Sequence, residues 1–391
     1  MLEAMTANFR HTDLHLVEPP FGSNLTTLVL ELDYLRKKPT HGTTHPVIFI
    51  QLKKIFHLLE SIGSARIEGN RTTLAEYIER KIEGSKTKDE RFLEIENNEK
   101  ALNFIEENIN NCEINRALLS EIHKIITKNL TPPPKGEGSN EPGNYRKVNV
   151  SLTGSSHIPP DVSTVNSYME ELFNFINKPD LPQCDLLKVA IAHHRFAWIH
   201  PFDNGNGRVV RLLTYAMLIK YGFRVHVDGR ILNPTAVFCS DREKYYYYLS
   251  LADEGSDNGL LSWCEYVLNG LKNEINKIDN LLDYQFLQTK ILLPAINSAL
   301  ERKYITEKEY KILKVSVEKQ IIRANDIKQL FPEKIPAVIS RYIKKLIDKK
   351  MLQPEEDKSR KYVLCFENNY LLREVIKMLD KEQMLPMSIN Q

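Results

Sequence analysis

The chain lacks the features that would place it in a membrane or an oxidising compartment. Its 391 residues include five scattered cysteines and no CxxC pair, which favours incidental thiols in a reducing compartment over a disulfide framework. No segment approaches the ~18 uninterrupted apolar residues of a membrane span. Residues 1–20 carry Glu3, Arg10 and Asp13, where a secretory signal would need an apolar stretch. We therefore expect a cytoplasmic protein that does not contact a membrane.

Strong charge of one sign is also missing. The formal net charge of +2 gives no field over the whole chain, so nucleic-acid binding would need a local basic patch. The hydrophobic fraction of 42% and the charged fraction of 27% are typical of a soluble globular protein with enough apolar material for a core. The length predicts two or three domains, and no internal repeat is visible.

Apolar residues recur at helical spacing through most of the chain, which predicts a mainly α fold. Proline and glycine interrupt the pattern at 131–143, which we expect to be a loop. Alternating apolar residues predict a short strand over 145–152, followed by a turn at 153–156, and a second strand over 362–366. The predicted helices cover 47–61, 74–82, 91–109, 114–130, 162–177, 185–199, 207–221, 241–271 with a break at 255–259, 273–297, 305–317, 323–330 and 335–351.

One loop between two predicted helices combines residues suited to binding phosphate: His200-Pro201-Phe202-Asp203-Asn204-Gly205-Asn206-Gly207-Arg208-Val209-Val210-Arg211. Gly205 and Gly207 let the backbone turn sharply and approach a ligand closely. The amides that open the following helix favour an anion, and Asn206 can add a side-chain donor. Arg208 and Arg211 are three apart on one helix face, and guanidinium groups suit phosphate oxygens. The loop therefore predicts a cradle for a polyphosphate.

His200 lies at the rim of this predicted cradle. An ordinary imidazole pKa near ~6.5 allows the neutral ring to accept a proton from an attacking hydroxyl. An isolated histidine is more often a core or capping residue, but the glycines, asparagine and arginines at fixed spacing favour a catalytic base. Phe202 is expected to anchor the loop in the core without acting in the chemistry.

These residues resemble the signature of Fic-domain proteins, His-x-Phe-x-(Asp/Glu)-Gly-Asn-Gly-Arg-x-x-Arg. The resemblance extends from about Ser64 to about Leu271. It includes Gly143-Asn144-Tyr145-Arg146, similar to the family's lead into a β-hairpin flap, and Tyr245-Tyr246 followed by Leu249. It implies a mostly helical core and transfer of AMP from ATP to a Ser, Thr or Tyr hydroxyl of a target protein.

The resemblance also implies roles for individual residues. His200 would be the base, and Arg208 and Arg211 would hold the β- and γ-phosphates. Tyr245 and Tyr246 either line the adenine or ribose pocket or are ordinary core and surface aromatics. The α-phosphate would bind in an anion hole formed by three consecutive residues: Gly205, Asn206 and Gly207.

Asn204 is a departure from the family pattern. It stands where the family usually has an Asp or Glu that binds a metal ion. A carboxylate neutralises and orients Mg²⁺ (or Mn²⁺) better than an amide, although an amide oxygen can also be a ligand. Asn204 is therefore the candidate metal ligand, and its identity puts metal affinity and the rate of transfer in question.

An inhibitory motif is suggested ahead of the core. Ser64-Ala65-Arg66-Ile67-Glu68-Gly69 resembles the family's pattern (Ser/Thr)-x-x-x-Glu-(Gly/Asn). The resemblance implies that Glu68 pairs with Arg211 and removes the cation that should bind the γ-phosphate. Ser64 and Glu68 are therefore candidate inhibitory residues. Without the core signature, Glu68 would be taken for a surface carboxylate near a helix end.

The C-terminal part differs in kind. Three short helices, a charged turn and a strand predict a winged helix-turn-helix at 301–368. From Lys334 to Lys361 there are nine Lys or Arg and four Asp or Glu, a local net charge of +5. Lys358, Arg360 and Lys361 lie where a wing would touch phosphate. The module either contacts DNA or docks on a protein, a second copy of this chain included, and the sequence leaves both open.

The predicted organisation has five parts: an N-terminal helical region with the inhibitory motif (1–110), a Fic core with a β-hairpin flap (111–275), a connecting helix (276–300), the winged-helix-like module (301–368) and a C-terminal tail (369–391). The leading hypothesis is an autoinhibited protein adenylyltransferase that uses ATP to modify an unidentified protein or itself. One alternative is a DNA-binding regulator whose weakly active Fic core senses nucleotide. Another is removal of AMP at the same site, with Glu68 orienting water.

Overall fold

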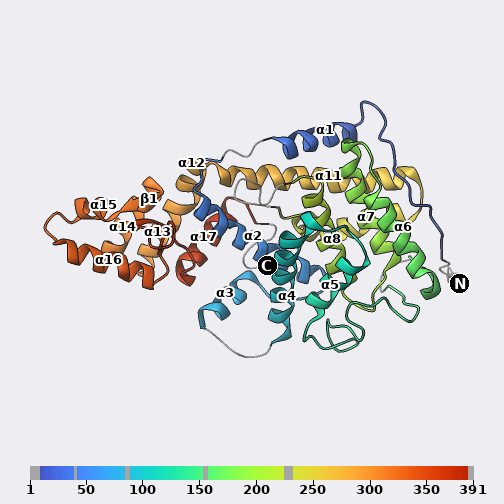
Figure 1. The fold of residues 1–391 in the computed structure, drawn as a ribbon, viewed down its shortest axis with the longest axis horizontal. Coiled ribbons are helices and arrows are strands. Elements are labelled where there is room, and N and C mark those ends of the chain that lie inside the picture. The colour runs from blue at the N-terminus through green and yellow to red at the C-terminus, as the bar shows by residue number, and fades with distance from the viewer. Residues whose placement is uncertain (1–8, 39–41, 84–88, 153–156, 224–231, 386–391) are drawn as a thin grey trace, which may run out of the picture.

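The computed structural model describes residues 9–38, 42–83, 89–152, 157–223 and 232–385. Most of these residues are helical, and the strands form one small antiparallel sheet (Figure 1). The molecule is elongated, with the sheet near one end and a larger helical body at the other. The mainly α fold predicted from the sequence is confirmed. None of the described helices combines the length and the apolarity needed to cross a bilayer.

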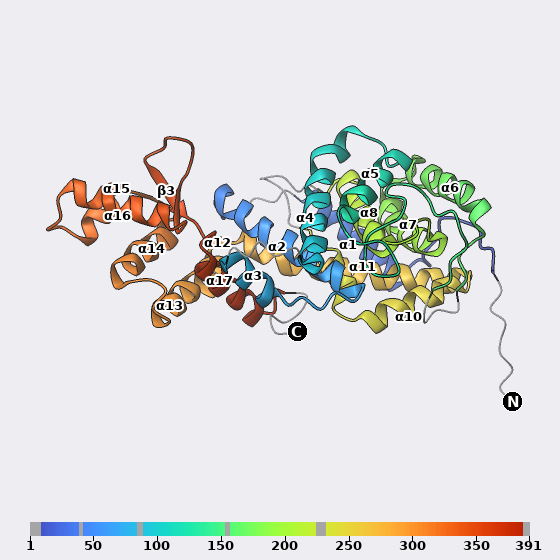
Figure 2. The ribbon, with the colours of Figure 1, turned by 90° about the horizontal axis from the view of Figure 1, so that it is seen from below.

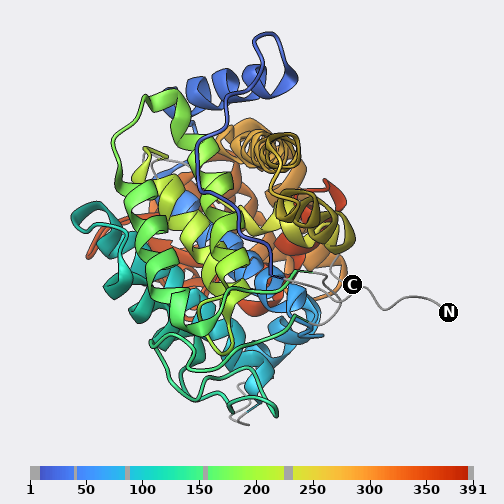
Figure 3. The same cartoon turned by 90° about the vertical axis from the view of Figure 1, so that its right-hand side faces the viewer.

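The larger body is built around α7 (Asp185–Ile199) and α8 (Asn206–Lys220). Both were predicted to within one residue, and α8 is buried along nearly its whole length because apolar residues lie on all of its faces. The segment ahead of α1 crosses α7 (Figure 3), where Arg195 donates to the Thr12 carbonyl at 2.8 Å. The surrounding helices are α1 (Asn24–Lys37), α4 (Glu90–Asn108), α5 (Arg116–Thr127), α6 (Val165–Asn177), α9 (Thr235–Cys239), α10 (Arg242–Asp253) and α11 (Asp257–Asp279).

The smaller body, which we call the C-terminal module, follows α12 (Tyr284–Phe286) and a π-helical turn (Leu287–Leu292). The central strand β3 pairs with β1 and β2 in an antiparallel manner, with Ile322 opposite Tyr362 and Gln353 opposite Val363. Strand β3 was predicted, whereas β1 and β2 were not. The elements are α13 (Leu293–Glu301), α14 (Glu307–Lys319), β1 (Ile321–Arg323), α15 (Ala324–Leu330), α16 (Pro336–Asp348), β2 (Leu352–Pro354), β3 (Lys361–Leu364) and α17 (Asn369–Lys381).

Helix α2 (Pro46–Ile67) lies between the two bodies (Figure 2), and α3 (Leu74–Glu83) follows it beside α17. The apolar residues of α2 up to Ala65 belong to the same hydrophobic core as the C-terminal module. Its last residue, Ile67, belongs instead to the core of the larger body. The helix that carries the predicted inhibitory motif is therefore shared between both parts of the molecule.

The structure departs from the predicted elements in three places. No strand forms over 145–152, because Arg146 binds the neighbouring loop: its N–H donates to the Pro201 carbonyl at 2.8 Å and its Nε to the His200 carbonyl at 2.9 Å. The predicted turn at 153–156 lies outside the described residues. The expected connecting helix 276–300 is divided after Asp279 into shorter elements. The expected tail begins with α17, which buries apolar residues against α13 and α3.

Candidate active site

The loop between α7 and α8 is held by side chains that bond to its backbone. Phe202 is fully buried, and its ring stacks on that of His123 with centroids 3.9 Å apart. The Asn206 amide closes the loop, because Oδ1 accepts from the Phe202 N–H at 2.8 Å and Nδ2 donates to the Phe202 carbonyl at 2.9 Å. Phe202 is thus the anchor that the sequence predicted. The Asn206 side chain, expected to donate to a ligand, is used within the loop.

Two glycines shape the start of α8. Gly205 has a φ of 75°, which an L side chain rarely adopts, and it directly precedes the first residue of the helix. A Cβ on Gly207 would lie 2.0 Å from Oε1 of Glu68, so glycine is what lets Glu68 approach this turn. Gly205, the N-cap residue of α8, has no side chain to cap the helix, so among the described residues the first-turn amides have no side-chain cap and can face an anion.

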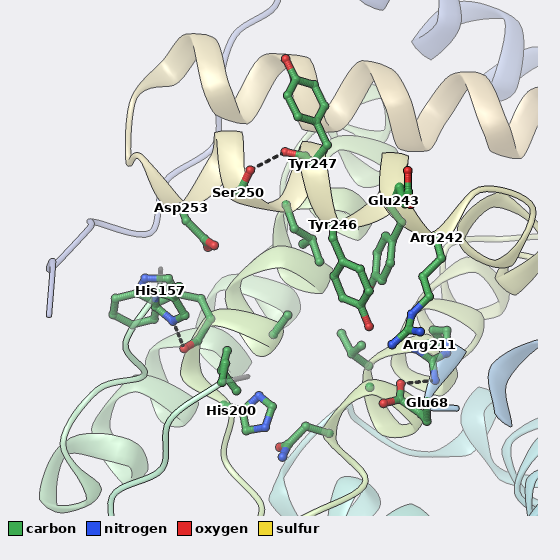
Figure 4. Close-up of a pocket in the computed structure, with 18 of the residues that line it drawn as sticks. Glu68, His157, His200, Arg211, Arg242, Glu243, Tyr246, Tyr247, Ser250 and Asp253 are labelled. Atoms are coloured by element: carbon green, nitrogen blue, oxygen red, sulfur yellow. Dashed lines mark hydrogen bonds and ion pairs between the residues drawn. The ribbon is translucent and has the colours of Figure 1, made fainter. Parts of the chain in front are cut away.

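A cavity of about 580 Å³ opens beside this turn (Figure 4). Its volume falls in the range of small-molecule sites. The end of α7, the start of α8 and the end of α2 form one side, and α10 forms the other. Seven predicted site residues line it: Glu68, His200, Asn206, Gly207, Arg211, Tyr245 and Tyr246. Four others are not among its described lining residues: Ser64, Asn204, Gly205 and Arg208.

His200 ends α7 in a left-handed conformation, with φ of 52°, and contributes to the cavity wall. Burial lowers the pKa of its imidazole to about 4, although the nearby Glu68 carboxylate acts in the opposite direction. A pKa below neutrality keeps the ring uncharged at pH 7, and the uncharged ring is the form that accepts a proton. The predicted base therefore lies at the cavity in its basic form.

Glu68 and Arg211 form a partly buried ion pair, with Oε1 2.7 Å from Nη2. Arg211 also donates to Ser64, from Nε to Oγ at 2.9 Å and from Nη2 to the carbonyl at 2.9 Å. Burial alone would raise the pKa of Glu68, but the charge and hydrogen bond of Arg211 outweigh it, so the pKa lies below its ordinary value. Because the Arg211 side chain is 1% exposed and the Glu68 side chain 27%, the contact is a charge-assisted, partly buried bond and not a solvated surface pair.

Arg208 does not take the place expected from its spacing. Its guanidinium lies 3.4 Å from Glu94 Oε1, and its Nη2 donates to the Glu137 carbonyl at 2.6 Å and lies 3.3 Å from the Glu137 carboxylate. A spacing of three residues puts both arginines on one side of α8, but the two side chains extend toward different carboxylates. Arg211 therefore reaches the cavity, whereas Arg208 is fully buried against α4 and the 131–143 loop.

Asn204, the candidate metal ligand, is also engaged within the loop. Its Oδ1 accepts from the Gly205 N–H at 2.7 Å, and its Nδ2 donates to the Gly136 carbonyl at 3.3 Å. Among the described residues, no group of three or more His, Cys, Asp or Glu side chains is placed to hold a metal ion. In this conformation the Asn204 amide oxygen does not fit the role of a metal ligand.

The two tyrosines of α10 have different surroundings. Tyr245 is 3% exposed, and its hydroxyl lies 2.9 Å from Nε2 of His193 on α7, so it holds α10 in the core. Tyr246 is 44% exposed, lines the cavity, and carries the Arg242 guanidinium 5.4 Å from its ring centroid. Tyr246 thus offers an aromatic face to a ligand, whereas the buried Tyr245 ring exposes little of its surface to the cavity.

Sequence reasoning missed several residues of the cavity. His157 lies 2.8 Å from the Trp198 carbonyl, and Asp253 lies 2.9 Å from His194. Arg242, Tyr246, Leu249 and Asp253 follow one another at helical spacing along α10, so extending the Tyr-Tyr-x-x-Leu segment by a turn in each direction would have found Arg242 and Asp253. Nothing in the sequence marks His157, which comes from an irregular segment.

Comparison with known proteins places this loop in a family. Residues 113–218 match the Fic/DOC family. The matched segment contains α5, α6, α7, nearly all of α8 and the whole His200–Arg211 loop, whose motif resembled the same family. Residues 113–218 are therefore similar to a Fic domain. The match does not extend to α2, α10 or the C-terminal module.

Curated relatives include the protein adenylyltransferase Fic of Drosophila erecta, which is 28% identical over 204 residues, 51% of this chain and 37% of the relative. The protein of the same name from Culex quinquefasciatus is 29% identical over 207 residues, 51% of this chain and 37% of the relative. The match therefore spans little more than a third of the length of these relatives.

Solved structures show the same fold. A Fic family protein from Desulfovibrio desulfuricans G20 aligns with a TM-score of 0.51 and 18% identity, covering 89% of this chain and 98% of that chain. A Fic domain containing signaling protein from Bacteroides thetaiotaomicron VPI-5482 aligns with a TM-score of 0.51 and 17% identity, covering 66% of this chain and 96% of that chain.

Proposed function

We propose that this chain is a nucleotidyltransferase that moves AMP from ATP to a hydroxyl side chain of a protein, either a separate target or the chain itself. The observation that carries the proposal is the position of uncharged His200 on a cavity wall next to the uncapped first turn of α8. A base beside an anion-binding turn is the arrangement that transfer of a phosphoryl-linked group needs. The curated relatives, named protein adenylyltransferase Fic, support the same reaction.

The proposed reaction needs few groups. The target hydroxyl gives its proton to the His200 imidazole while its oxygen attacks the α-phosphorus of ATP. A bond forms between that oxygen and the α-phosphorus, and the bond from the α-phosphorus to the α,β-bridging oxygen breaks. Pyrophosphate leaves, and AMP stays on the target oxygen. The backbone amides of Gly207 and its neighbours stabilise charge on the α-phosphate, and Arg211 binds the terminal phosphates once it is free.

Autoinhibition by Glu68 is part of the proposal. Arg211 bonds through Nε and Nη2 to Glu68 and to the hydroxyl and carbonyl of Ser64, so two of its three guanidinium nitrogens are engaged in the described conformation. A carboxylate also lies over Gly207, where the phosphates would enter. Both effects disfavour a productive polyphosphate pose, because Glu68 neutralises the charge of Arg211, occupies its Nη2 and repels an incoming phosphate. Release of Glu68 is therefore expected to activate transfer.

A divalent cation, Mg²⁺ or Mn²⁺, would supply positive charge to the phosphates when bound. Asn204 is the candidate ligand from sequence, but its oxygen is occupied by the Gly205 N–H.

The test is to incubate the full-length Glu68→Gly protein with α-labelled ATP and Mg²⁺, alone and with cell extract, and to search by mass spectrometry for peptides that carry AMP. We expect labelled protein, and loss of at least about a hundredfold in rate when His200→Ala is added, the size of general-base catalysis. The His200→Ala protein must keep the helical circular dichroism of the parent. Equal labelling by both proteins would contradict the proposed mechanism.

A second, separate proposal concerns the C-terminal module, which has the helix and strand order of a winged helix. Two cations on the outer face of α16, Arg341 and Lys344, and two in the turn before β3, Lys358 and Arg360, make no ion pair with any described residue. Lys345, Lys349 and Lys361, by contrast, are bound by Glu309 and Glu355. Unpaired cations on a protruding helix and turn favour contact with the phosphates of duplex DNA.

The full-length protein mixed with a random-sequence DNA duplex at low salt tests this second proposal. We expect binding that weakens steeply with salt, and a shallower salt slope when Lys344 and Arg360 are both changed to Ala. The double change should leave AMP transfer intact. No binding at low salt would favour protein docking as the role of the module.

A further inference from the structure

The cavity has a second cation that the sequence motif does not contain. Arg242, the first residue of α10, lines the cavity and extends toward Arg211 and Glu68 (Figure 4). Arg211 is bound by Ser64 and Glu68 through Nε and Nη2, and Arg208 is bound to Glu94, outside the described lining of the cavity. Among the described residues, Arg242 makes no ion pair, and its one recorded contact is with the Tyr246 ring at 5.4 Å.

The remaining charges of α10 leave this end of the cavity positive. The carboxylate of Glu243 points away from Arg211 and Glu68 in Figure 4. Asp253 lies at the far end of the helix, next to His157, and is bound by His194 at 2.9 Å. An anion entering beside Gly207 therefore meets Arg242 and not a carboxylate of α10.

We propose that Arg242 binds the terminal phosphates of the nucleotide donor and holds the nucleotide in the cavity while Glu68 occupies Arg211. The inference rests on the proposed function, since it takes the cavity to be the ATP site. The ligand class is a nucleoside di- or triphosphate, because a monophosphate has no group to reach this end. Arg242 thus matters most while Glu68 is in place, and less once Arg211 becomes available.

The test is calorimetric titration of the full-length protein with ATP, ADP and AMP at constant Mg²⁺. Arg242→Ala should raise the Kd for ATP roughly tenfold, as for loss of one charge-assisted hydrogen bond, and leave the Kd for AMP unchanged. In the Glu68→Gly background the effect on ATP should be smaller. Arg242→Lys should restore part of the affinity. Lys244→Ala, which removes the same charge from the same helix outside the described lining of the cavity, is the matched control and should bind like wild type.

The outcomes separate the inference from the proposed function. Unchanged ATP affinity in a folded Arg242→Ala protein would overturn the inference and leave AMP transfer standing. Equal losses for ATP and AMP would also overturn it, because they would place Arg242 at the nucleoside through Tyr246. Failure of wild type and Glu68→Gly alike to bind any of the three nucleotides would overturn both.

A different observation concerns how Glu68 is positioned. Gln51 on α2 is 4% exposed; its Nε2 donates to the Leu364 carbonyl at 3.0 Å, and its Oε1 accepts from the Phe366 N–H at 2.8 Å. Near the start of α2, the His45 N–H donates to Gln320 Oε1 at 2.8 Å. The module thus binds the first part of α2 by polar bonds and by a shared apolar core, whereas Lys53 and His57 on α2 bind Glu106 of the larger body and Glu60 binds its Thr235. The 22-residue helix ends directly before Glu68.

From these contacts we infer that the C-terminal module holds Glu68 in its inhibitory position. A hydrogen-bonded helix moves largely as a unit, so a shift of the module relative to α8 moves the last turn of α2 away from Arg211. A partner that displaces the module would then activate the site without touching it. This inference also rests on the proposed function.

Gln51→Met tests it, because the change keeps the size of the side chain and removes both bonds to the module. We expect the labelling rate to rise several-fold over wild type, with no further gain in the Glu68→Gly background. Lys54→Ala, which removes an exposed ion pair between the same helix and Glu367, is the control and should change little. If Gln51→Met fails to fold, Gln320→Ala removes the bond to His45 instead.

Amide hydrogen exchange shows whether the Gln51→Met change has loosened the contact between α2 and the module. If the amides of residues 361–366 exchange faster in the variant while its labelling rate stays at the wild-type value, the coupling does not exist. A gain of equal size in the Glu68→Gly background would also overturn it, because the effect would then bypass Glu68.

Discussion

The larger body and the C-terminal module bury different kinds of side chain. In the larger body, five charged residues are at most 3% exposed: Glu94, Lys188, Arg195, Arg208 and Arg211. In the described part of the module, 301–385, the buried charged residues are Glu309 and Glu374. Burying an unpaired charged side chain costs free energy, so a cluster of buried charges is unexpected in a part of the protein that serves only for packing. The buried charge that gathers at Arg208 and Arg211, beside one loop, therefore points to function.

The two carboxylates that bind cations in these regions make the contrast concrete. Glu309 caps α14 and binds Lys349, the residue that follows α16, at 2.7 Å, so its ion pair joins two elements of the module. Glu68 binds Arg211 at the same distance of 2.7 Å, but this pair occupies a group that faces a cavity. Similar geometry thus serves packing in one region and, in our proposal, regulation in the other.

The largest expected effect is a difference in stability between one variant in the larger body and one in the C-terminal module. Arg208→Ala leaves Glu94 buried without its partner and should lower the free energy of unfolding by about 3–5 kcal/mol, as for a broken buried pair. Lys345→Ala, which removes an exposed partner of Glu309, should cost less than ~1 kcal/mol. Urea denaturation of both variants measures the two values. Burial raises the pKa of Glu94, and loss of Arg208 raises it further, so the Glu94 carboxylate of the variant is protonated first as pH falls. The protonated group has no charge left unpaired, so the difference in the free energy of unfolding between Arg208→Ala and wild type should become smaller at low pH. Equal losses of unfolding free energy in the two variants would contradict the difference proposed between the two regions.

Sequence reasoning located the motif-bearing elements better than the contacts between them. The limits of α7, the burial of Phe202 and the Glu68–Arg211 contact follow from local pattern and motif. The direction of Arg208 could not be predicted, because its partners Glu94 and Glu137 are distant in sequence. Strands β1 and β2 have three residues each, too few to show alternation. Helix α17 has apolar residues at helical spacing, but its position after the last strand suggested a tail.

The next effect concerns pH. Burial lowers the pKa of His200 to about 4, so the imidazole stays uncharged and basic as pH falls from 8 to 5.5. The labelling rate of Glu68→Gly should therefore be nearly flat over this range. An ordinary pKa near ~6.5 would instead reduce the rate about tenfold at pH 5.5. Initial rates in buffers of constant ionic strength distinguish the two profiles, provided circular dichroism shows the protein folded throughout.

The smallest effect is expected at Asn204. Asn204→Asp keeps an oxygen for the Gly205 N–H and replaces the group that donates to Gly136 with a second oxygen, which can bind Mg²⁺. We expect transfer by Glu68→Gly to rise a few-fold and to saturate at lower Mg²⁺ when this change is added. Titration of the labelling rate with Mg²⁺ checks this. Superimposable curves with and without the Asn204→Asp change would show that residue 204 does not reach the metal.

The central claim is that Glu68 restrains the site by occupying Arg211. Initial labelling rates with ATP should be compared for wild type, Glu68→Gly, Arg211→Ala and the double variant under identical conditions. The account predicts that Glu68→Gly is roughly ten- to a hundredfold faster than wild type, as for release of one buried charged hydrogen bond, and that the double variant loses this gain. A Glu68→Gly protein no faster than wild type, or a double variant as fast as Glu68→Gly, would contradict it.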